Sequence, residues 1–149
     1  MNKKICVIGT GNWGKNHIKT LSELGYLRGV VDLNKEELET ILSQYKDVNT
    51  HESLDDALNQ DYDGFTVATP ADTHYEIAKT IIKKGKHLLV EKPLALKLSE
   101  AKELVRLAKE AKVNLMVGHL LLFHPAIRKI KEVLDSGKIG KHFMELCAA

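Results

Sequence analysis

Short, continuous apolar runs that alternate with helical segments constrain the fold of this 149-residue chain more than any other feature. The runs are continuous, without polar residues at every second position, as is typical of strands buried on both faces of a parallel sheet. A weaker run around Val48 predicts one more strand, at an edge of the sheet. The five clear runs are Ile5 to Ile8, Gly29 to Val31, Phe65 to Ala68, Leu88 to Val90 and Leu115 to Val117.

The segments between these runs have the spacing of amphipathic helices. We expect Gly25 to end the first helix in a left-handed conformation, Asn34 and Ser53 to cap the next two, and Ser99 to open a later one. The alternation predicts a doubly wound parallel α/β sheet with helices on both faces. The predicted apolar helix faces are Ile18, Leu21 and Leu24; Leu38, Ile41, Leu42 and Tyr45; Ile77, Ala78, Ile81 and Ile82 before Gly85; and Ala101, Leu104, Val105 and Ala108.

The first strand is followed at once by the sequence GTGNWG at residues 9–14, a G-x-G-x-x-G pattern that opens a helix. A dinucleotide-binding glycine loop requires this position between strand and helix. Gly9 permits a tight turn, Gly11 lets the backbone approach a pyrophosphate, and Gly14 lets the helix pack closely on the strand. Amide groups near Asn12 and Trp13 are predicted to meet the phosphates. The loop indicates a Rossmann dinucleotide-binding fold, and the alternative is a glycine turn without a ligand.

Asp32 follows the second strand, where a carboxylate accepts hydrogen bonds from both hydroxyls of the adenosine ribose and favours NAD. Lys35 leaves NADP as an alternative cofactor, because a basic group tolerates the 2′-phosphate of NADP. The alternative interpretation is that Asp32 only caps the following helix. An S-adenosylmethionine-dependent methyltransferase also carries an acid at this position, but its first loop has a different glycine spacing, so that class ranks well behind.

Further polar residues follow the fourth and fifth strands, whose carboxyl ends face the ligand crevice in such sheets. Thr69 and Pro70 are predicted to line the nicotinamide end of the cofactor, and His74 either contacts it or packs at the start of a helix. Glu91, Lys92 and Pro93 come next and are also predicted to contact the cofactor. A charged pair at the end of a buried strand has no packing reason. Lys92 is therefore a candidate proton donor or acceptor, or a cation that orients a substrate hydroxyl; the alternative is an exposed loop lysine. Pro93 is predicted to hold this turn rigid, with a cis peptide bond.

Two histidines follow the last strand of the predicted sheet. His119 comes directly after Gly118, and His124 precedes Pro125 at the start of a further helix. Both are candidates for substrate contact at the same crevice, with a purely structural role as the alternative for each.

Composition excludes several classes of function. The net charge of +2 and the aromatic content of 5% argue against a nucleic-acid-binding surface. Cys6 and Cys147 lie at opposite ends, so we expect no disulfide framework and no metal site, and we expect a reduced, cytoplasmic protein with Cys6 in its core. A membrane-spanning helix needs about 20 consecutive apolar residues, and no apolar stretch of the sequence approaches this length.

Together these motifs resemble the Gfo/Idh/MocA family, which is named for glucose-fructose oxidoreductase and inositol dehydrogenase. The resemblance implies an NAD(P)-dependent oxidoreductase that moves a hydride between a sugar, nucleotide sugar or polyol and the nicotinamide. It implies that Lys92 contacts the substrate and assists proton transfer. The segment from Gly118 to Leu122 is similar to dehydrogenases of nucleotide sugars such as UDP-N-acetylglucosamine, although many members carry a basic residue where this chain has Leu122. The motifs that carry the resemblance are the glycine loop, Thr69-Pro70 with His74, Glu91-Lys92-Pro93, and Gly118-His119 followed by Phe123-His124-Pro125-Ala126.

Members of this family are longer and carry a second, substrate-binding and dimerising domain. The resemblance implies a dinucleotide-binding domain at 1–120, and at 121–149 a linker helix from Pro125 to Gly137 with the first strand of a truncated second domain. Two hypotheses follow: the cofactor-binding part of a sugar dehydrogenase, weakly active or inactive by itself, or a stand-alone module that acts as a sensor or as half of a two-chain enzyme. We expect a homo-oligomer, namely a dimer made through the helix from Pro125 to Ser136 or through a tail that carries Phe143, Met144 and Leu146. The alternative is that this tail is disordered.

Overall fold

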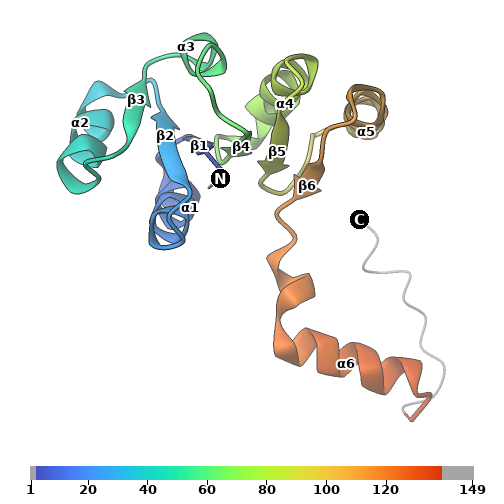
Figure 1. The fold of residues 1–149 in the computed structure, drawn as a ribbon. Helices are drawn as coiled ribbons and strands as arrows, with labels where there is room; N and C mark the ends of the chain where they lie inside the picture. The colour runs from blue at the N-terminus through green and yellow to red at the C-terminus, as the bar shows by residue number, and fades with distance from the viewer. Residues whose placement is uncertain (1–2, 139–149) are drawn as a thin grey trace. The chain divides into compact units, whose positions relative to one another are not determined.

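The computed structural model describes residues 3–138, and the chain divides into two units, residues 1–118 and 119–149. The first unit holds a sheet of six parallel strands in the order β3-β2-β1-β4-β5-β6 (Figure 1). This order confirms the predicted doubly wound α/β sheet and the predicted edge position of the weak third strand. The strands are β1 (Ile5–Ile8), β2 (Leu27–Val31), β3 (Asn49–His51), β4 (Gly64–Val67), β5 (His87–Val90) and β6 (Leu115–Val117).

Five helices of the first unit pack on two faces of this sheet (Figure 1). Because strand side chains alternate between faces, Val7 joins one core cluster while its neighbours Cys6 and Ile8 join the other. The cluster around Val7 takes its helical residues from α1 and α2, and the cluster around Cys6 takes its helical residues from α3, α4 and α5. The helices are α1 (Asn12–Glu23), α2 (Lys35–Gln44), α3 (Leu54–Leu58), α4 (His74–Lys83) and α5 (Leu98–Ala111), with a short 3-10 turn η1 (Ala71–Thr73) before α4.

Most of the predicted helix ends are confirmed. The Asn34 side chain accepts a hydrogen bond from the amide of Glu36 at 3.0 Å, and the Ser53 hydroxyl accepts one from the amide of Asp56 at 3.1 Å. Gly25 follows Leu24, the C-cap of α1, and has a φ of +75°, as a left-handed helix end requires.

Three expectations about the elements are wrong. Helix α5 begins at Leu98 with Lys97 at its N-cap, so Ser99 lies inside the first turn and does not open the helix. Leu24, Leu42 and Val105 were expected on apolar helix faces but are 60%, 46% and 42% exposed. Leu24 lies beyond the last residue of α1, and the other two lie at the border of an apolar face. Strand β6 is the second edge of the sheet, and its Met116 is 46% exposed, so this strand is not buried on both faces.

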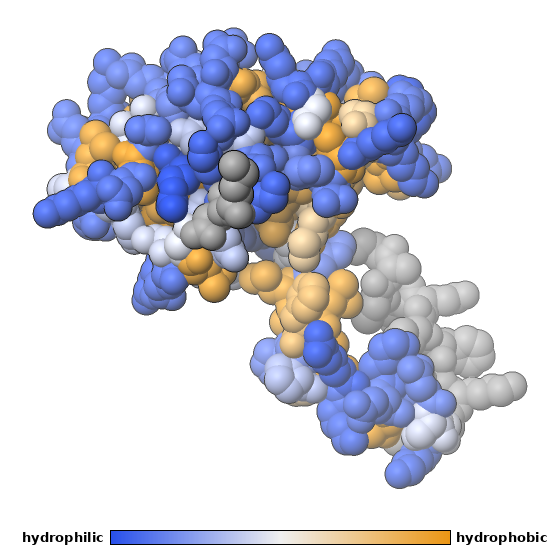
Figure 2. Space-filling view, in the orientation of Figure 1, coloured by the Kyte–Doolittle hydropathy of each residue, from blue (hydrophilic) through white to orange (hydrophobic). Residues whose placement is uncertain are grey.

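The second unit is described through residue 138. It contains a 3-10 turn η2 (Leu120–Phe123) and helix α6 (Pro125–Asp135), with Pro125 at the first helical position and Gly137 at a φ of +70° after its end. This confirms the predicted helix, whereas the predicted strand with Phe143, Met144 and Leu146 lies outside the described residues. The four residues of η2 are apolar and exposed, and an apolar surface before α6 is visible in Figure 2. Within residues 3–138, no helix is long and apolar enough to cross a membrane.

Candidate functional site

The residues that directly follow the strands form one row along the carboxyl edge of the sheet. Each donates its backbone amide to the last residue of a neighbouring strand: Gly9 to Val31 at 2.8 Å, Ala68 to Ile8 at 2.8 Å, and Glu91 to Val67 at 2.9 Å. Asp32 and Gly118 continue the row in the same way. The glycine loop, Asp32, the Thr69-Pro70 turn and the Glu91-Lys92-Pro93 turn therefore begin at one edge, as the sequence analysis expects.

A cavity of about 570 Å³ opens at this edge, with lining residues that follow β1, β2, β3 and β4. Its size lies within the usual range of small-molecule sites. Leu33, Glu52, Leu54, Thr73 and Ile77 also line it and were not predicted as site residues from the sequence. The lining residues that the sequence analysis predicts as cofactor contacts are Gly9, Gly11, Asn12, Trp13, Asp32, Thr69 and Pro70.

The three glycines of the loop have three different surroundings. Gly9 has a φ of +94°, and a Cβ on it would lie 2.8 Å from the carbonyl oxygen of Ala68. A Cβ on Gly14 would overlap the carbonyl of Gly9, whereas a Cβ on Gly11 would meet no atom within 4 Å. The geometry thus agrees with a tight turn at Gly9, close packing at Gly14, and open space for a ligand at Gly11.

Helix α1 begins beside this open space without a side-chain cap. Its N-cap is Gly11, which makes no side-chain hydrogen bond, and its first turn holds no acidic residue. The first amide groups of a helix have no partner within the helix and attract anions. The start of α1 therefore fits the pyrophosphate of a dinucleotide.

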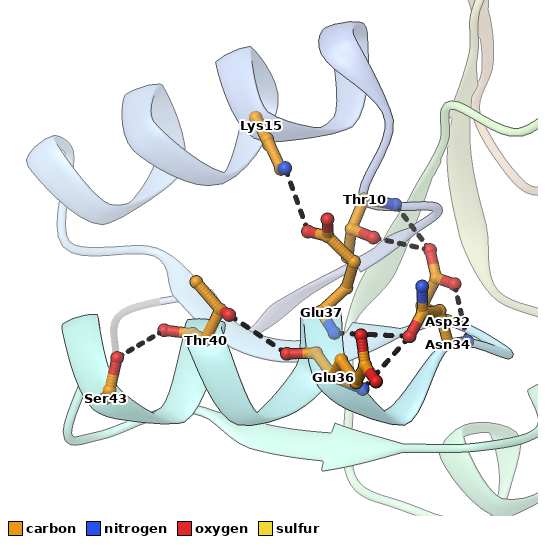
Figure 3. A network of polar contacts seen from close by, with 8 residues as sticks. All are labelled: Thr10, Lys15, Asp32, Asn34, Glu36, Glu37, Thr40 and Ser43. Atoms are coloured by element: carbon orange, nitrogen blue, oxygen red, sulfur yellow. Dashed lines mark hydrogen bonds and ion pairs between the residues drawn. The ribbon is translucent and has the colours of Figure 1, made fainter.

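Asp32 is held in place by three hydrogen bonds (Figure 3). Its Oδ2 accepts from the amide of Thr10 at 2.7 Å and from the Thr10 hydroxyl at 2.6 Å, and its Oδ1 accepts from the amide of Asn34 at 2.9 Å. Partial burial would raise the pKa of Asp32, but these hydrogen bonds outweigh it and hold the pKa below its usual range. The carboxylate is thus ionised beside the glycine loop. Because Asn34 provides the cap of α2, the interpretation of Asp32 as only a helix cap is wrong.

Glu91 is buried, with 5% exposure, and has protein partners. Its Oε1 lies 2.8 Å from Nε2 of His17 on α1, and its Oε2 accepts from the backbone amide of Lys92 at 3.3 Å. A Cβ on Gly118 would come within 3.0 Å of this carboxylate, so a glycine there leaves room for it. The expectation that the charged pair has no packing reason is therefore wrong for Glu91. Lys92 is exposed, and its bond to Pro93 is cis, as predicted.

His74 is 1% exposed at the start of α4. Its Nδ1 lies 2.7 Å from the carbonyl oxygen of Pro93, and its Nε2 lies 2.9 Å from that of Thr69. The ring therefore joins the turn after β4 to the turn after β5, which agrees with the predicted packing at a helix start. Gly14, His74, Glu91, Lys92 and Pro93 are not among the residues that line the cavity, and their contact with a cofactor stays a prediction.

The two candidate substrate histidines lie in the second unit. His124 caps α6, with its Nδ1 accepting from the amide of Ala126 at 3.2 Å, and His119 is exposed. The cap gives His124 a structural role, and contact of either residue with a substrate stays a prediction.

The parallel sheet, the glycine loop and the cavity at the carboxyl edge together define a dinucleotide-binding α/β protein. Residues 3–119 match the Gfo/Idh/MocA family, described as "Oxidoreductase family, NAD-binding Rossmann fold", and the chain belongs to this family.

Named relatives include two dehydrogenases. UDP-N-acetylglucosamine 3-dehydrogenase of Acidithiobacillus ferrooxidans is 32% identical over 126 residues, which are 85% of this chain and 40% of that protein. Inositol 2-dehydrogenase of Serratia proteamaculans is 31% identical over an alignment of 154 positions, which covers 99% of this chain and 46% of that protein. The crystal structure of GenD2 from gentamicin A biosynthesis, in complex with NAD, is similar to this chain with a TM-score of 0.86 and 30% sequence identity. The match covers 92% of this chain and 40% of the GenD2 chain. The chain thus spans less than half the length of these relatives.

Proposed function

We propose that this chain binds NAD through residues 1–120, as the dinucleotide-binding domain of an oxidoreductase. The reaction is hydride transfer between a carbon of a sugar, nucleotide sugar or polyol and the nicotinamide. The observation that carries the proposal is the cavity whose lining runs from the glycine loop over Asp32 to Thr69 and Pro70. Family membership, and the NAD complex of the similar GenD2 structure, support this choice of cofactor.

Each part of the dinucleotide has a matching set of residues in this proposal. The Asp32 carboxylate accepts hydrogen bonds from the adenosine ribose, and the apolar side chains of Leu33, Leu54 and Ile77 surround the adenine. The pyrophosphate takes the open space at Gly11 and the uncapped start of α1. Thr69 and Pro70 line the nicotinamide end.

The cofactor supplies a hydride acceptor or donor, and the chain supplies proton transfer and positioning. Lys92 holds or releases the proton of the substrate hydroxyl. The Glu91 carboxylate, held by His17, accepts from the Lys92 backbone amide and fixes the turn that carries this lysine. His119 and His124 remain our candidates for substrate contact.

Isothermal titration of the 149-residue chain with NAD tests the cofactor proposal. We expect saturable binding with one site per chain. Circular dichroism on the same sample establishes that the protein is folded. Absence of binding of both NAD and NADP to a folded chain would refute the proposal.

A Lys92→Met variant tests the role of the lysine. Because Lys92 does not line the cavity, NAD should still bind to the variant. Any NAD reduction that the wild-type chain shows with inositol or UDP-N-acetylglucosamine should disappear. Turnover that survives in the variant would contradict the assignment.

We also infer a cytoplasmic homo-oligomer. The inference rests on the cysteine content, with Cys6 buried as a free thiol, and on the family resemblance. Sedimentation of a chain that ends at Gly118 tests the association, which should be lost with the second unit. Unchanged association of the shorter chain would contradict an interface in that unit.

A further inference from the structure

The cavity contains a second carboxylate that follows the edge strand β3. Strands β2 and β3 pair in parallel with Val31 opposite His51, and the amide of Asp32 donates to the carbonyl of His51 at 3.2 Å. Paired strands lie about 4.8 Å apart, so Asp32 and Glu52 leave neighbouring strands at the same level. Both residues line the cavity. The ribose end of the cavity therefore carries two acidic side chains.

Glu52 also forms an ion pair with Lys35, the basic residue that follows Asp32 in the sequence. The Nζ of Lys35, the first residue of α2, lies 3.0 Å from Oε2 of Glu52. Lys35 itself is not among the residues that line the cavity. A free ammonium at this place would suit the 2′-phosphate of NADP, but here it faces a carboxylate. The two side chains are 71% and 58% exposed, so solvent and salt screen this pair.

We propose that Glu52 is a specificity-determining residue that makes this site select NAD over NADP. Its carboxylate adds a second negative charge beside Asp32, and it holds the Lys35 ammonium that would otherwise neutralise a 2′-phosphate. A phosphate monoester carries between one and two negative charges at neutral pH, so two carboxylates and a paired lysine disfavour it. The hydroxyl of NAD carries no charge and is not repelled. The inference rests on the proposed dinucleotide binding.

Titration of NAD and NADP against single variants and a double variant tests this. Glu52→Gln should raise the ratio of NADP affinity to NAD affinity by roughly three- to tenfold at low ionic strength, as expected for one nearby, partly screened charge. Lys35→Ala should lower the same ratio, and the double variant should fall between the two. The shifts should shrink at high salt. Because both dinucleotides are measured on the same protein, a loss of folded material cancels in the ratio.

Glu110→Gln is the matched control. Glu110 lies on α5, has the same 58% side-chain exposure as Glu52, and pairs with Arg106 at 2.8 Å, but it does not line the cavity. This variant removes the same charge and should leave the ratio unchanged. An equal shift in this control would mean that net charge acts, and would overturn the assignment to Glu52.

The outcomes separate this inference from the proposed function. If NAD binds but Glu52→Gln leaves the ratio unchanged, the role of Glu52 is overturned while dinucleotide binding stands. A ratio that moves in the same direction in Glu52→Gln and Lys35→Ala overturns it as well. If a folded wild-type chain binds neither dinucleotide, both proposals fail.

Discussion

Gly11 and Gly14 belong to the same glycine motif, yet the surroundings of an added methyl group differ at the two positions. At Gly11 it points into open space, and the φ of −62° there suits any residue. At Gly14 it would overlap the carbonyl of Gly9. Ligand binding and folding can therefore be disturbed separately within one motif.

A pair of variants tests this separation. Gly11→Val should weaken NAD binding by at least about tenfold, because its side chain fills the path of the pyrophosphate, while the free energy of unfolding changes by about 0.5 kcal/mol or less. Gly14→Ala should lower that free energy by about 1–3 kcal/mol, because helix and loop must move apart. Titration calorimetry and denaturant unfolding measure the two effects. Equal NAD binding by Gly11→Val would contradict the placement of the pyrophosphate.

Asp32 gives a prediction with a defined sign. Its pKa in the folded chain lies below the value in the unfolded chain, because its hydrogen bonds favour the ionised form. Its contribution to stability is therefore full above a pH of about 4 and is lost as the pH falls through the folded-state pKa. The stability difference between wild type and Asp32→Asn should be constant near neutral pH and should shrink below a pH of about 4. Urea unfolding at several pH values measures it, and a difference that grows on acidification would contradict the assignment.

Among the elements, the sheet and its glycine loop were predictable from the sequence, because continuous apolar runs leave little alternative to buried parallel strands. Glu52 was not predictable. The run around Val48 predicted an edge strand but not its bounds, because β3 consists of the polar residues Asn49, Thr50 and His51. Only the pairing of β3 with β2 brings Glu52 beside Asp32. The contacts of Glu91 with His17 and of His74 with Pro93 were also not predictable from the sequence, because the partners come from other elements of the fold. Leu42 and Val105 show that helical spacing gives the direction of an apolar face but not its width.

His51, the last residue of the edge strand β3, should make the free energy of unfolding depend on pH. Nε2 of His51 lies 2.8 Å from the hydroxyl of Tyr62, and burial lowers the pKa of His51, against a smaller opposite effect of Asp56. As the pH falls below about 6.5, the unfolded chain takes up this proton before the folded chain does, so the folded state loses stability. His51→Gln should reduce the loss of stability between about pH 6.5 and 5. An unchanged slope in thermal unfolding would contradict this.

The cap of α2 offers a simpler test. The Asn34 side chain accepts hydrogen bonds from the amides of Glu36 and Glu37. Asn34→Ala should lower the free energy of unfolding by about 1 kcal/mol, whereas Asn34→Asp should keep most of it. Denaturant unfolding of both variants distinguishes a lost cap from a general surface effect. Equal losses in the two would contradict the capping role.

For the whole molecule, both core clusters and the cavity lie within the first unit. Among residues 3–138, no buried member of either cluster comes after Ala108, and the cavity lining ends at Ile77. A chain that ends at Gly118 should therefore unfold cooperatively and bind NAD within about threefold of the affinity of the 149-residue chain, a difference of less than about 0.7 kcal/mol. Thermal unfolding and titration calorimetry check this. A shorter chain that folds but no longer binds NAD would mean that the second unit contributes to the site.

The closeness of Gly118 to the Glu91 carboxylate also has an evolutionary consequence. Alanine at position 118 would press against a buried acid that His17 holds in place. Gly118→Ala requires that carboxylate to give way by a few tenths of an ångström, which a prior Glu91→Asp would make unnecessary, so the order of the two substitutions matters. Substitutions at the end of β5 and at the end of β6 should therefore be correlated among descendants, although the two residues lie 27 positions apart in the chain.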